Sequence, residues 1–284
     1  MQRKLAKIKM GIQGPSGSGK TYSSLLIAFG LCNNWSKIAI IDTENHSADL
    51  YSQLGSYNVL SLEKPFTPEN YIDAIDLCIQ QGMEVIIIDS VSHEWEGQGG
   101  ILEIHGNMMG NSFTNWNRVT PRHNAFVQKI IQSPVHIIAT IRAKQDYVLN
   151  EKNGKLVPEK VGLKGITRDG LDYEFTIMFE IDMKHNVTAT KDRTGLYSDI
   201  PSFIITPNTG KRIKDWCLNG PELESIHEQI TRAENVDELR KIYNSFANYR
   251  QIIEPRILSR KKELESLKHR SNGEEEENGT GQSK

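Results

Sequence analysis

The first half of the chain alternates between short apolar runs and segments in which apolar residues recur at helical spacing. The apolar runs, rich in β-branched residues, are residues 7–12, 37–42, 84–89 and 135–141. Strands this apolar on both faces are typical of a parallel sheet that helices cover on each side. Helical spacing predicts the connecting helices at residues 20–32, 68–81 and about 118–132. The pattern therefore predicts an α/β fold with a mostly parallel central sheet.

The pattern changes after Ile141. A polar segment containing lysine and glycine, residues 143–170, includes the sequence EKNGK, which predicts a hairpin tip inside an otherwise irregular loop. Residues 173–182 and 185–192 then alternate apolar and polar positions, so we expect adjacent antiparallel strands joined near Lys184. Residues 201–206 are a candidate for another strand.

From Pro221 onward the spacing of apolar residues is helical, with helices predicted at residues 221–233, 235–247 and 254–269. The last residues combine low hydrophobicity with a run of four glutamates, a composition typical of disorder. We therefore expect three parts, which are a main α/β domain at residues 1–220, a helical module at 221–270 and a disordered acidic tail at 271–284.

Composition limits the kinds of partner. The 284 residues carry 34 Lys and Arg against 36 Asp and Glu, a net charge of −2, so any anion-binding surface must be local. The three cysteines lie in apolar segments at spacings that suit neither a zinc site nor a disulfide framework, which predicts buried thiols in a reducing compartment. No apolar run of signal-peptide length follows the basic start, and nowhere do 18 apolar residues follow one another. We expect a soluble, cytoplasmic protein with no membrane partner.

The first apolar run is followed by GPSGSGKT, which satisfies the phosphate-binding motif G-x-x-x-x-G-K-[ST] at every fixed position. The glycines let backbone N–H groups turn toward phosphates, the lysine reaches the terminal phosphates, and the threonine hydroxyl can hold Mg²⁺ at a helix start. The strand before and the helix after are the context that the motif requires. We therefore expect ATP, or another purine nucleotide, to bind with Mg²⁺ at Gly14, Pro15, Ser16, Gly17, Ser18, Gly19, Lys20 and Thr21.

Such a site needs a carboxylate at the end of a buried strand to help hold the metal. The run EVIIIDS supplies it as Asp89, which we expect to share Mg²⁺ with Thr21. Hydrolysis further needs a carboxylate that orients the attacking water, and in many P-loop enzymes it directly follows the metal-binding aspartate, where this chain has Ser90. Two candidates remain, which are Glu44 after the second apolar run and Glu94, five residues beyond Asp89.

The order of these motifs resembles the core of the RecA-type recombinases. The resemblance is carried by a D-x-E sequence that ends at Glu44, a short helix with Tyr51, and a later strand that ends in D-S at Asp89. It implies that Glu44 is the catalytic base and that Tyr51 stacks on the adenine, with a half-buried packing role as the alternative for Tyr51. It also implies that Thr140 stands where this family senses the terminal phosphate, although the usual glutamine is absent.

Two cations, Lys191 and Arg193 in TKDRTG, stand one residue apart near the end of a predicted strand, and this spacing puts both side chains on one side of it. The pattern K-x-R-x-G is similar to the finger of the DnaB-type helicases, and its placement is similar to that of paired lysines in RecA. In such ATPases one subunit presents its cations to the nucleotide of a neighbour, where they stabilise the transition state. The resemblance implies a head-to-tail homo-oligomer, ring or filament, with both residues catalytic in trans. A solvated turn is the alternative.

The resemblance also implies two mobile DNA-binding loops. Residues 93–116 are rich in glycine and carry aromatic residues, for which packing is as good an explanation as base stacking. Residues 142–170 carry seven Lys and Arg against four Asp and Glu, and seven minus four leaves +3. Long irregular segments are usually functional, and flexible cations suit the backbone of single-stranded DNA. A merely solvated face is the alternative here.

Residues 8–206 as a whole resemble the RecA-like AAA ATPases of bacteriophage recombination and replication modules, most specifically in DSVSHEWEG and TKDRTG. The resemblance implies an ATPase that acts on single-stranded DNA in recombination, annealing or replication, in the cytoplasm of a bacterial host. A DnaB-like helicase motor or a helicase loader is the second hypothesis. The third is a nucleotide-dependent interaction module whose C-terminal helices or tail recruit a replication or recombination protein without direct DNA contact.

Overall fold

The computed structural model describes the backbone of residues 6–152, 155–218, 221–246 and 249–278. The chain forms two compact units, one spanning Lys7–Cys217 and another that begins at Leu218. This division falls close to the boundary expected after residue 220.

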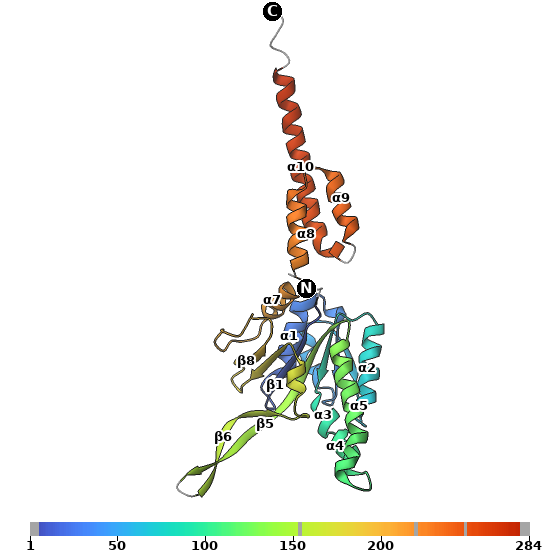
Figure 1. Cartoon of the computed structure of the whole chain (residues 1–284), viewed down its shortest axis with the longest axis vertical. Coiled ribbons are helices and arrows are strands. Elements are labelled where there is room, and N and C mark those ends of the chain that lie inside the picture. The colour runs from blue at the N-terminus through green and yellow to red at the C-terminus, as the bar shows by residue number, and fades with distance from the viewer. Residues whose placement is uncertain (1–5, 153–154, 219–220, 247–248, 279–284) are drawn as a thin grey trace, which may run out of the picture. The chain divides into compact units, whose positions relative to one another are not determined.

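The first unit is built on a single sheet that runs in the order β3-β2-β4-β5-β1-β7-β8 (Figure 1). Neighbours from β3 to β7 pair in parallel, and β8 pairs antiparallel with β7. The predicted α/β fold with a mostly parallel sheet and a late antiparallel pair is confirmed. The strands are β1 Lys9–Gly14, β2 Ile38–Asp42, β3 Asn58–Ser61, β4 Val85–Asp89, β5 His136–Lys152, β6 Lys155–Gly165, β7 Ile177–Ile181 and β8 Val187–Asp192.

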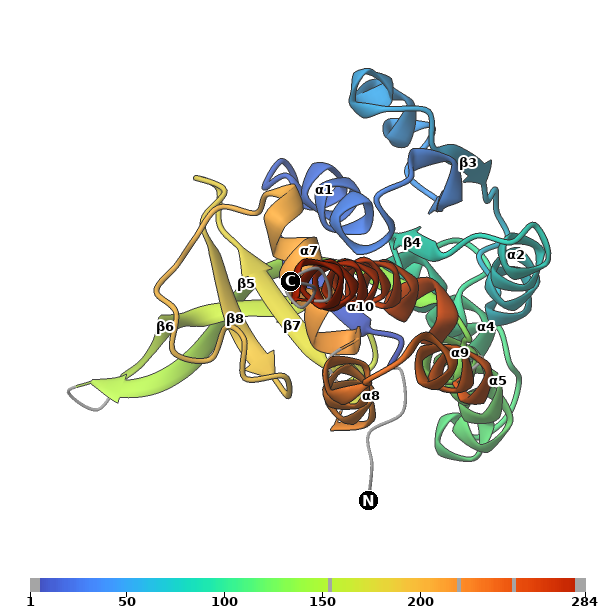
Figure 2. The ribbon, with the colours of Figure 1, turned by 90° about the horizontal axis from the view of Figure 1, so that it is seen from above.

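Helices cover both faces of this sheet (Figure 2). Successive residues of β2 point to opposite faces, so Ile38 and Ile40 join the core under α1 and α7, whereas Ala39 and Ile41 join the core under α2 and α5. The helical segments are α1 Lys20–Cys32, η1 Trp35–Lys37, η2 Ser47–Leu54, α2 Pro68–Gln80, α3 Ser92–Glu96, α4 Ile101–Gly106, α5 Ser112–Gln132, α6 Leu171–Glu174 and α7 Pro207–Leu218, where η marks a 3₁₀ helix.

The long helices agree with the periodicity, and their ends follow capping. Helix α1 has the predicted bounds, and α2 ends one residue earlier than expected. Helix α5 begins at Ser112 rather than near residue 118, because the side chain of Asn111 accepts the backbone N–H of Phe113 at 2.8 Å and so caps the helix. Strand β3 was not predicted, since it is short and mostly exposed.

The prediction of an irregular loop at residues 143–170 is wrong. Strand β5 continues unbroken to Lys152, and β6 returns antiparallel to it from Lys155 to Gly165, forming a two-stranded ribbon. The ribbon could not be predicted from the sequence, because this polar segment lacks the regular alternation of apolar and polar residues that identifies a half-buried strand. The expected hairpin tip falls at residues 153–154, which lie outside the described residues, and Lys152 and Lys155 pair on either side of it.

Two details of the following region also differ. The segment expected to be a strand from residue 173 begins with the end of α6, and β7 starts only at Ile177. Residues 201–206 form no strand, because a single bridge between Val187 and Phe203 is the only pairing there among the described residues.

The second unit contains α8 Pro221–Arg232, α9 Val236–Ser245 and α10 Arg250–Asn278, around a core of its own that includes Leu223, Ile226, Leu239 and Ile253. Where a disordered tail is expected from residue 271, the backbone of α10 stays helical to Asn278, consistent with the good helix propensity of glutamate. Residues 279–284 lie outside the described residues. Over the described parts of the chain, no helix has the length and apolar character needed to cross a membrane.

Candidate nucleotide site

The candidate site lies at the carboxyl edge of the parallel strands. Sheet register pairs Asp42 of β2 with Asp89 of β4, and Gly14 of β1 with Arg142 of β5. Because parallel strands present their carboxyl ends at one edge, segments that are far apart in the sequence meet here. Strand β5 lies between β1, which leads into the phosphate loop, and β4, which ends at Asp89, so these two strands are not neighbours in the sheet.

The phosphate loop joins β1 to α1, and its conformation explains the glycines. Gly17 and Gly19 have φ values of 79° and 89°, where a side chain would be strained. A Cβ on Gly14 would lie 2.6 Å from the carbonyl oxygen of Ile181, so this position has no room for one. The predicted strand, loop and helix are therefore present, with Gly19 capping the helix that begins at Lys20.

Lys20 lies over this loop. Its Nζ donates to the carbonyl oxygens of Gly14 at 3.0 Å and Pro15 at 2.9 Å. Burial lowers the pKa of Lys20, while the nearby carboxylates of Asp89 and Glu44 raise it. An ammonium held among oxygen acceptors at the start of a helix is suited to contact phosphate.

Asp89 is buried and receives two hydroxyl groups. Thr21 donates to Oδ2 and Thr140 donates to Oδ1. Burial raises the pKa of Asp89, and the two hydroxyl donors oppose this shift. A carboxylate beside a threonine hydroxyl is an oxygen set that fits Mg²⁺, which usually takes one or two protein ligands and completes its shell with water and phosphate oxygens. In the described residues no group of three or more His, Cys, Asp or Glu could hold a metal.

Glu44 lines the same cavity as the loop and is held by three side chains. Arg142 donates through Nε to Oε1 at 2.7 Å and through a second nitrogen to Oε2, and the Ser90 hydroxyl is 3.2 Å from Oε1. The Asp42 carboxylate accepts the backbone N–H groups of Glu44 at 2.6 Å and Ala48 at 2.9 Å, which fixes the turn that carries Glu44. Burial alone would raise the pKa of Glu44, but the hydrogen bonds and charge of Arg142 bring it below its ordinary value.

A cavity of about 870 Å³ joins these groups. Tyr51 lies on its wall together with Tyr22, with ring centroids 5.8 Å apart, so two aromatic rings border the phosphate loop. Tyr51 is also partly buried against the core under α1, so its stacking on adenine stays a prediction. The lining residues are Ser16, Gly17, Gly19, Lys20, Thr21, Tyr22, Ser23, Glu44, Ser47, Tyr51, Asp89, Arg142, Ala143, Ile166, His185, Ile204 and Ile205.

Thr140 does not line this cavity. It is fully buried behind Asp89, and its hydroxyl contacts that carboxylate. Arg142, two residues further along β5, does reach the cavity. The sequence analysis did not place Arg142 at the nucleotide cavity. The signal that identifies it is its position two residues after Thr140 on β5, because alternate residues of a strand face the same side.

Glu94, the rival base, lies elsewhere. It is 1% exposed, and both of its oxygens lie within 3.1 Å of Nδ1 of His123 on α5. Burial raises the pKa of Glu94. Because this carboxylate is enclosed between α3 and α5 and does not line the cavity, it is placed to support the fold.

The segment 93–116, expected to be a mobile DNA loop, is largely helical. It contains α3, α4 and the first turn of α5. Trp116 stacks against His105, with centroids 4.0 Å apart, and against Trp95 at 5.9 Å. These contacts favour the packing explanation for the two tryptophans, while Phe113 remains 83% exposed.

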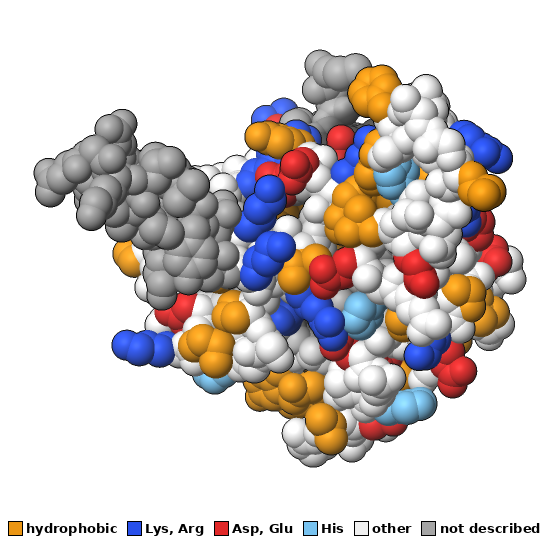
Figure 3. Space-filling model, turned by 90° about the horizontal axis from the view of Figure 1, so that it is seen from below, with side chains coloured by type: hydrophobic (Ala, Val, Ile, Leu, Met, Phe, Trp, Pro, Cys, Tyr) orange, Lys and Arg blue, Asp and Glu red, His pale blue; other side chains and the backbone are white. Residues whose placement is uncertain are grey.

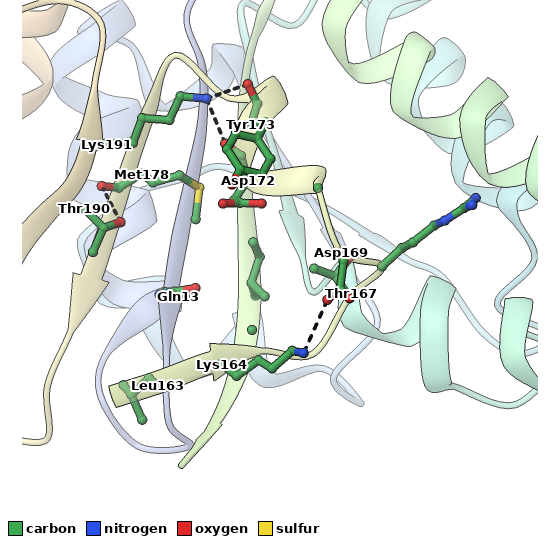
Figure 4. Close-up of a pocket in the computed structure, with 14 residues that line it drawn as sticks. Gln13, Leu163, Lys164, Thr167, Asp169, Asp172, Tyr173, Met178, Thr190 and Lys191 are labelled. Atoms are coloured by element: carbon green, nitrogen blue, oxygen red, sulfur yellow. Dashed lines mark hydrogen bonds and ion pairs between the residues drawn. The ribbon is translucent and has the colours of Figure 1, made fainter. Parts of the chain in front are cut away.

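Neither Lys191 nor Arg193 lines the nucleotide cavity of its own chain. Figure 4 shows Lys191 reaching toward the backbone of Asp172 and Tyr173. Lys191 Nζ donates to the carbonyl oxygens of Asp172, at 3.0 Å, and Tyr173, and Arg193 donates to the same Tyr173 oxygen at 3.1 Å. The expectation that both side chains project the same way is confirmed. Partial burial and the nearby Arg193 lower the pKa of Lys191.

The turn that carries these cations is folded around Asp192, a residue that the sequence analysis did not single out. Its Oδ1 accepts the backbone N–H of Thr194 at 2.7 Å, and its Oδ2 accepts that of Tyr197 at 2.7 Å. Burial raises the pKa of Asp192, but the hydrogen bonds lower it by more, so the pKa lies below its ordinary value. The conformation of the turn is therefore fixed by hydrogen bonds, unlike that of a loose surface loop.

His185 is a second residue near the site that no sequence motif indicated. Its Nδ1 lies 2.8 Å from the carbonyl oxygen of Ser18, so the turn between β7 and β8 touches the phosphate loop. A Cβ on Gly19 would lie 3.2 Å from the same ring nitrogen.

The parallel sheet, the phosphate loop and the paired Asp89 and Thr21 define a P-loop nucleotide-binding ATPase. The sequence agrees, because the AAA domain family matches residues 6–212, and the chain belongs to this family. Among curated proteins, none matches the chain closely enough to count as a relative.

Proposed function

We propose that this member of the AAA domain family hydrolyses ATP between neighbouring copies of itself and acts on single-stranded DNA, in phage-type recombination, annealing or replication. The bacterial cytoplasm is the compartment in which such a protein works. One observation carries the proposal, namely that strand β5 passes without a break from the nucleotide edge into the β5–β6 ribbon.

The ribbon and the α4–α5 connection extend from the same end of the first unit (Figure 1). Seen from that end, Lys and Arg side chains gather on this face of the first unit (Figure 3). Among the described side chains there, Lys164 is half-exposed, and the ribbon sequence adds further lysines. Local cations on an otherwise slightly acidic protein support binding to the phosphates of a single strand.

The geometry of the site supports the following chemistry. Thr21 and Asp89 would hold Mg²⁺, which supplies charge neutralisation at the phosphates, and Lys20 would contact the terminal phosphates. Glu44 would orient water and take its proton as the new phosphorus–oxygen bond forms and the bond to the leaving ADP breaks. Tyr51 would stack on the adenine.

The remaining catalytic charges are proposed to come from a second copy. Lys191 and Arg193 are absent from the cavity of their own chain, yet both sit on a folded turn that holds them together. Cations that meet the phosphates only from a neighbour imply a head-to-tail contact, which closes into a ring or continues as a filament.

The first test measures ATP hydrolysis with and without a dT oligonucleotide, across protein concentration and salt. The expected result is a specific activity that rises with protein concentration and with the oligonucleotide, and an oligonucleotide affinity that falls as salt rises. A rate independent of both DNA and protein concentration contradicts the proposal.

The second test mixes two inactive proteins. Arg193→Ala protomers keep the phosphate loop and Lys20→Ala protomers keep the cations, so their mixture should recover part of the activity that each lacks alone. Arg240→Ala, which removes an exposed arginine of the second unit, is the control and should retain full activity. Failure of the mixture to hydrolyse ATP contradicts catalysis in trans.

A second candidate function is favoured by the separate core of the second unit. A compact group of helices with its own buried residues can recruit a replication or recombination protein. A chain that hydrolyses ATP without any response to DNA, but captures such a protein through residues 221–270, would support this function. Strand-displacing unwinding would instead favour a helicase motor.

A further inference from the structure

The Arg142–Glu44 ion pair leaves the candidate base little freedom to act. Arg142 spans both carboxylate oxygens, and its Nε is 2.7 Å from Oε1. Ser90 adds a hydroxyl at 3.2 Å from that same oxygen. An ionised carboxylate oxygen offers about two lone pairs, so Oε1 is fully used and only Oε2 can accept a proton from water.

The ion pair also weakens the base. A guanidinium bound to both oxygens stabilises the ionised carboxylate, and Arg142 brings the pKa of Glu44 down despite its burial. Proton transfer becomes less favourable as the acceptor grows less basic. The pair therefore stabilises a state in which Glu44 is present at the site but poorly suited to activate water.

Arg142 occupies a position from which this pair can be opened. Its backbone N–H donates to the Ser92 hydroxyl at 2.9 Å, and its carbonyl accepts the N–H of Ile166 at 2.7 Å. The next residue, Ala143, is the first of β5 to pair with β6 at Gly165. Strain on the ribbon thus acts directly on the backbone of Arg142. The side chain is also 40% exposed and borders a second cavity of about 340 Å³, which Glu44 lines as well.

We propose that Arg142 restrains Glu44, and that hydrolysis accelerates when a ligand on the β5–β6 ribbon draws Arg142 away from it. The inference rests on the proposed function only in taking Glu44 as the base. The alternative is that Arg142 contacts the nucleotide and helps catalysis directly. Removal of the guanidinium should raise the rate of ATP hydrolysis under the proposal and lower it under the alternative.

The test is the rate of ATP hydrolysis by Arg142→Gln without DNA. Loss of a partly exposed ion pair should raise the rate on the order of fivefold above the wild type. Arg142→Lys, which keeps the charge but cannot span both oxygens, should give an intermediate rise. The matched control is Arg122→Gln, which breaks another two-pronged pair, with both nitrogens 2.7 Å from Glu69 on the surface between α5 and α2, and should leave the rate unchanged.

A dT oligonucleotide then tests the release through β5. It should stimulate the wild type by a larger factor than Arg142→Gln, because the variant has already lost the restraint. An equal factor in both proteins overturns release through the ribbon. A rate at or below that of the wild type for Arg142→Gln, in a protein that still melts cooperatively and binds a fluorescent ATP analogue, overturns the restraint itself.

The variant Glu44→Gln distinguishes a refuted restraint by Arg142 from a wrong assignment of Glu44 as the base. If Glu44→Gln hydrolyses ATP at the wild-type rate, Glu44 is not the base and the inference falls with it. If Glu44→Gln is inactive and Arg142→Gln is not accelerated, only the restraint is refuted. Where Arg142→Gln does not fold, Arg142→Lys decides the sign alone. The double variant should be as inactive as Glu44→Gln.

Discussion

Two glutamates compete for the water-activating role, and matched glutamine substitutions distinguish them. Glu44 lines the nucleotide cavity, whereas Glu94 is enclosed against His123. Glu44→Gln keeps the size of the side chain but removes the proton acceptor, so kcat should fall by about 10²–10⁴. Nucleotide binding should be little changed, because Lys20 and the loop are untouched.

Glu94→Gln should have almost no effect on the rate. The cost in stability is that a charge-assisted hydrogen bond, ~1.5–3 kcal/mol, becomes a neutral one of ~0.5–1.5 kcal/mol. The gain is that a carboxylate that is 1% exposed no longer has to be buried ionised. These terms oppose each other, so the free energy of unfolding should change by no more than about 1 kcal/mol at pH 7.

The pH dependence of stability gives a further check on Glu94. Burial raises the pKa of this carboxyl in the folded protein above its unfolded value of roughly 4.3. The stability that it contributes is therefore complete below that pH and is lost as pH rises through the folded pKa. Relative to the wild type, Glu94→Gln should gain stability as pH rises above roughly 4.3.

Steady-state hydrolysis, binding of a fluorescent ATP analogue and urea unfolding at several pH values measure these quantities on the same preparations. The assignment is refuted if Glu94→Gln folds and binds nucleotide but loses activity to the extent expected of Glu44→Gln. It is equally refuted if Glu44→Gln retains wild-type turnover.

Three other predictions concern the scaffold. Burial lowers the pKa of Lys9 to about 7, so wild-type stability should rise between pH 7 and pH 10 by up to ~1.4 kcal/mol per pH unit, and Lys9→Met should abolish that rise in urea titrations. Gly30→Ala should lower the melting temperature steeply, because its Cβ would meet a backbone oxygen of α7 at 2.0 Å, whereas Gly106→Ala, with no atom within 4 Å of the new carbon, should not. Thr140→Val removes a buried donor to Asp89 and should cost about 1–3 kcal/mol in chemical unfolding; a stability equal to that of the wild type would show that the hydroxyl is dispensable.

Much of the fold follows from local pattern. The β-branched runs at β1, β2, β4 and the start of β5 are apolar on both faces, which is enough to predict a covered parallel sheet. The glycines and Lys20 of the phosphate loop act within a few residues of one another, so their spacing alone identifies the site. Helix α1 and the β7–β8 pair were likewise predictable, because periodicity and turn residues are local properties.

The sequence by itself determined an α/β ATPase domain with a phosphate loop, an aspartate at the end of a buried strand and two cations on a late strand, since each of these depends on neighbours in the chain. Only the tertiary structure decided that Arg142 binds Glu44, that Thr140 lies behind Asp89, that Glu94 is enclosed, and that residues 143–152 pair with 155–165 as a ribbon. These outcomes depend on sheet order and register, which bring together residues far apart in the chain, such as Glu44 and Arg142 at a separation of 98 positions, and on the pairing of β5 with β6.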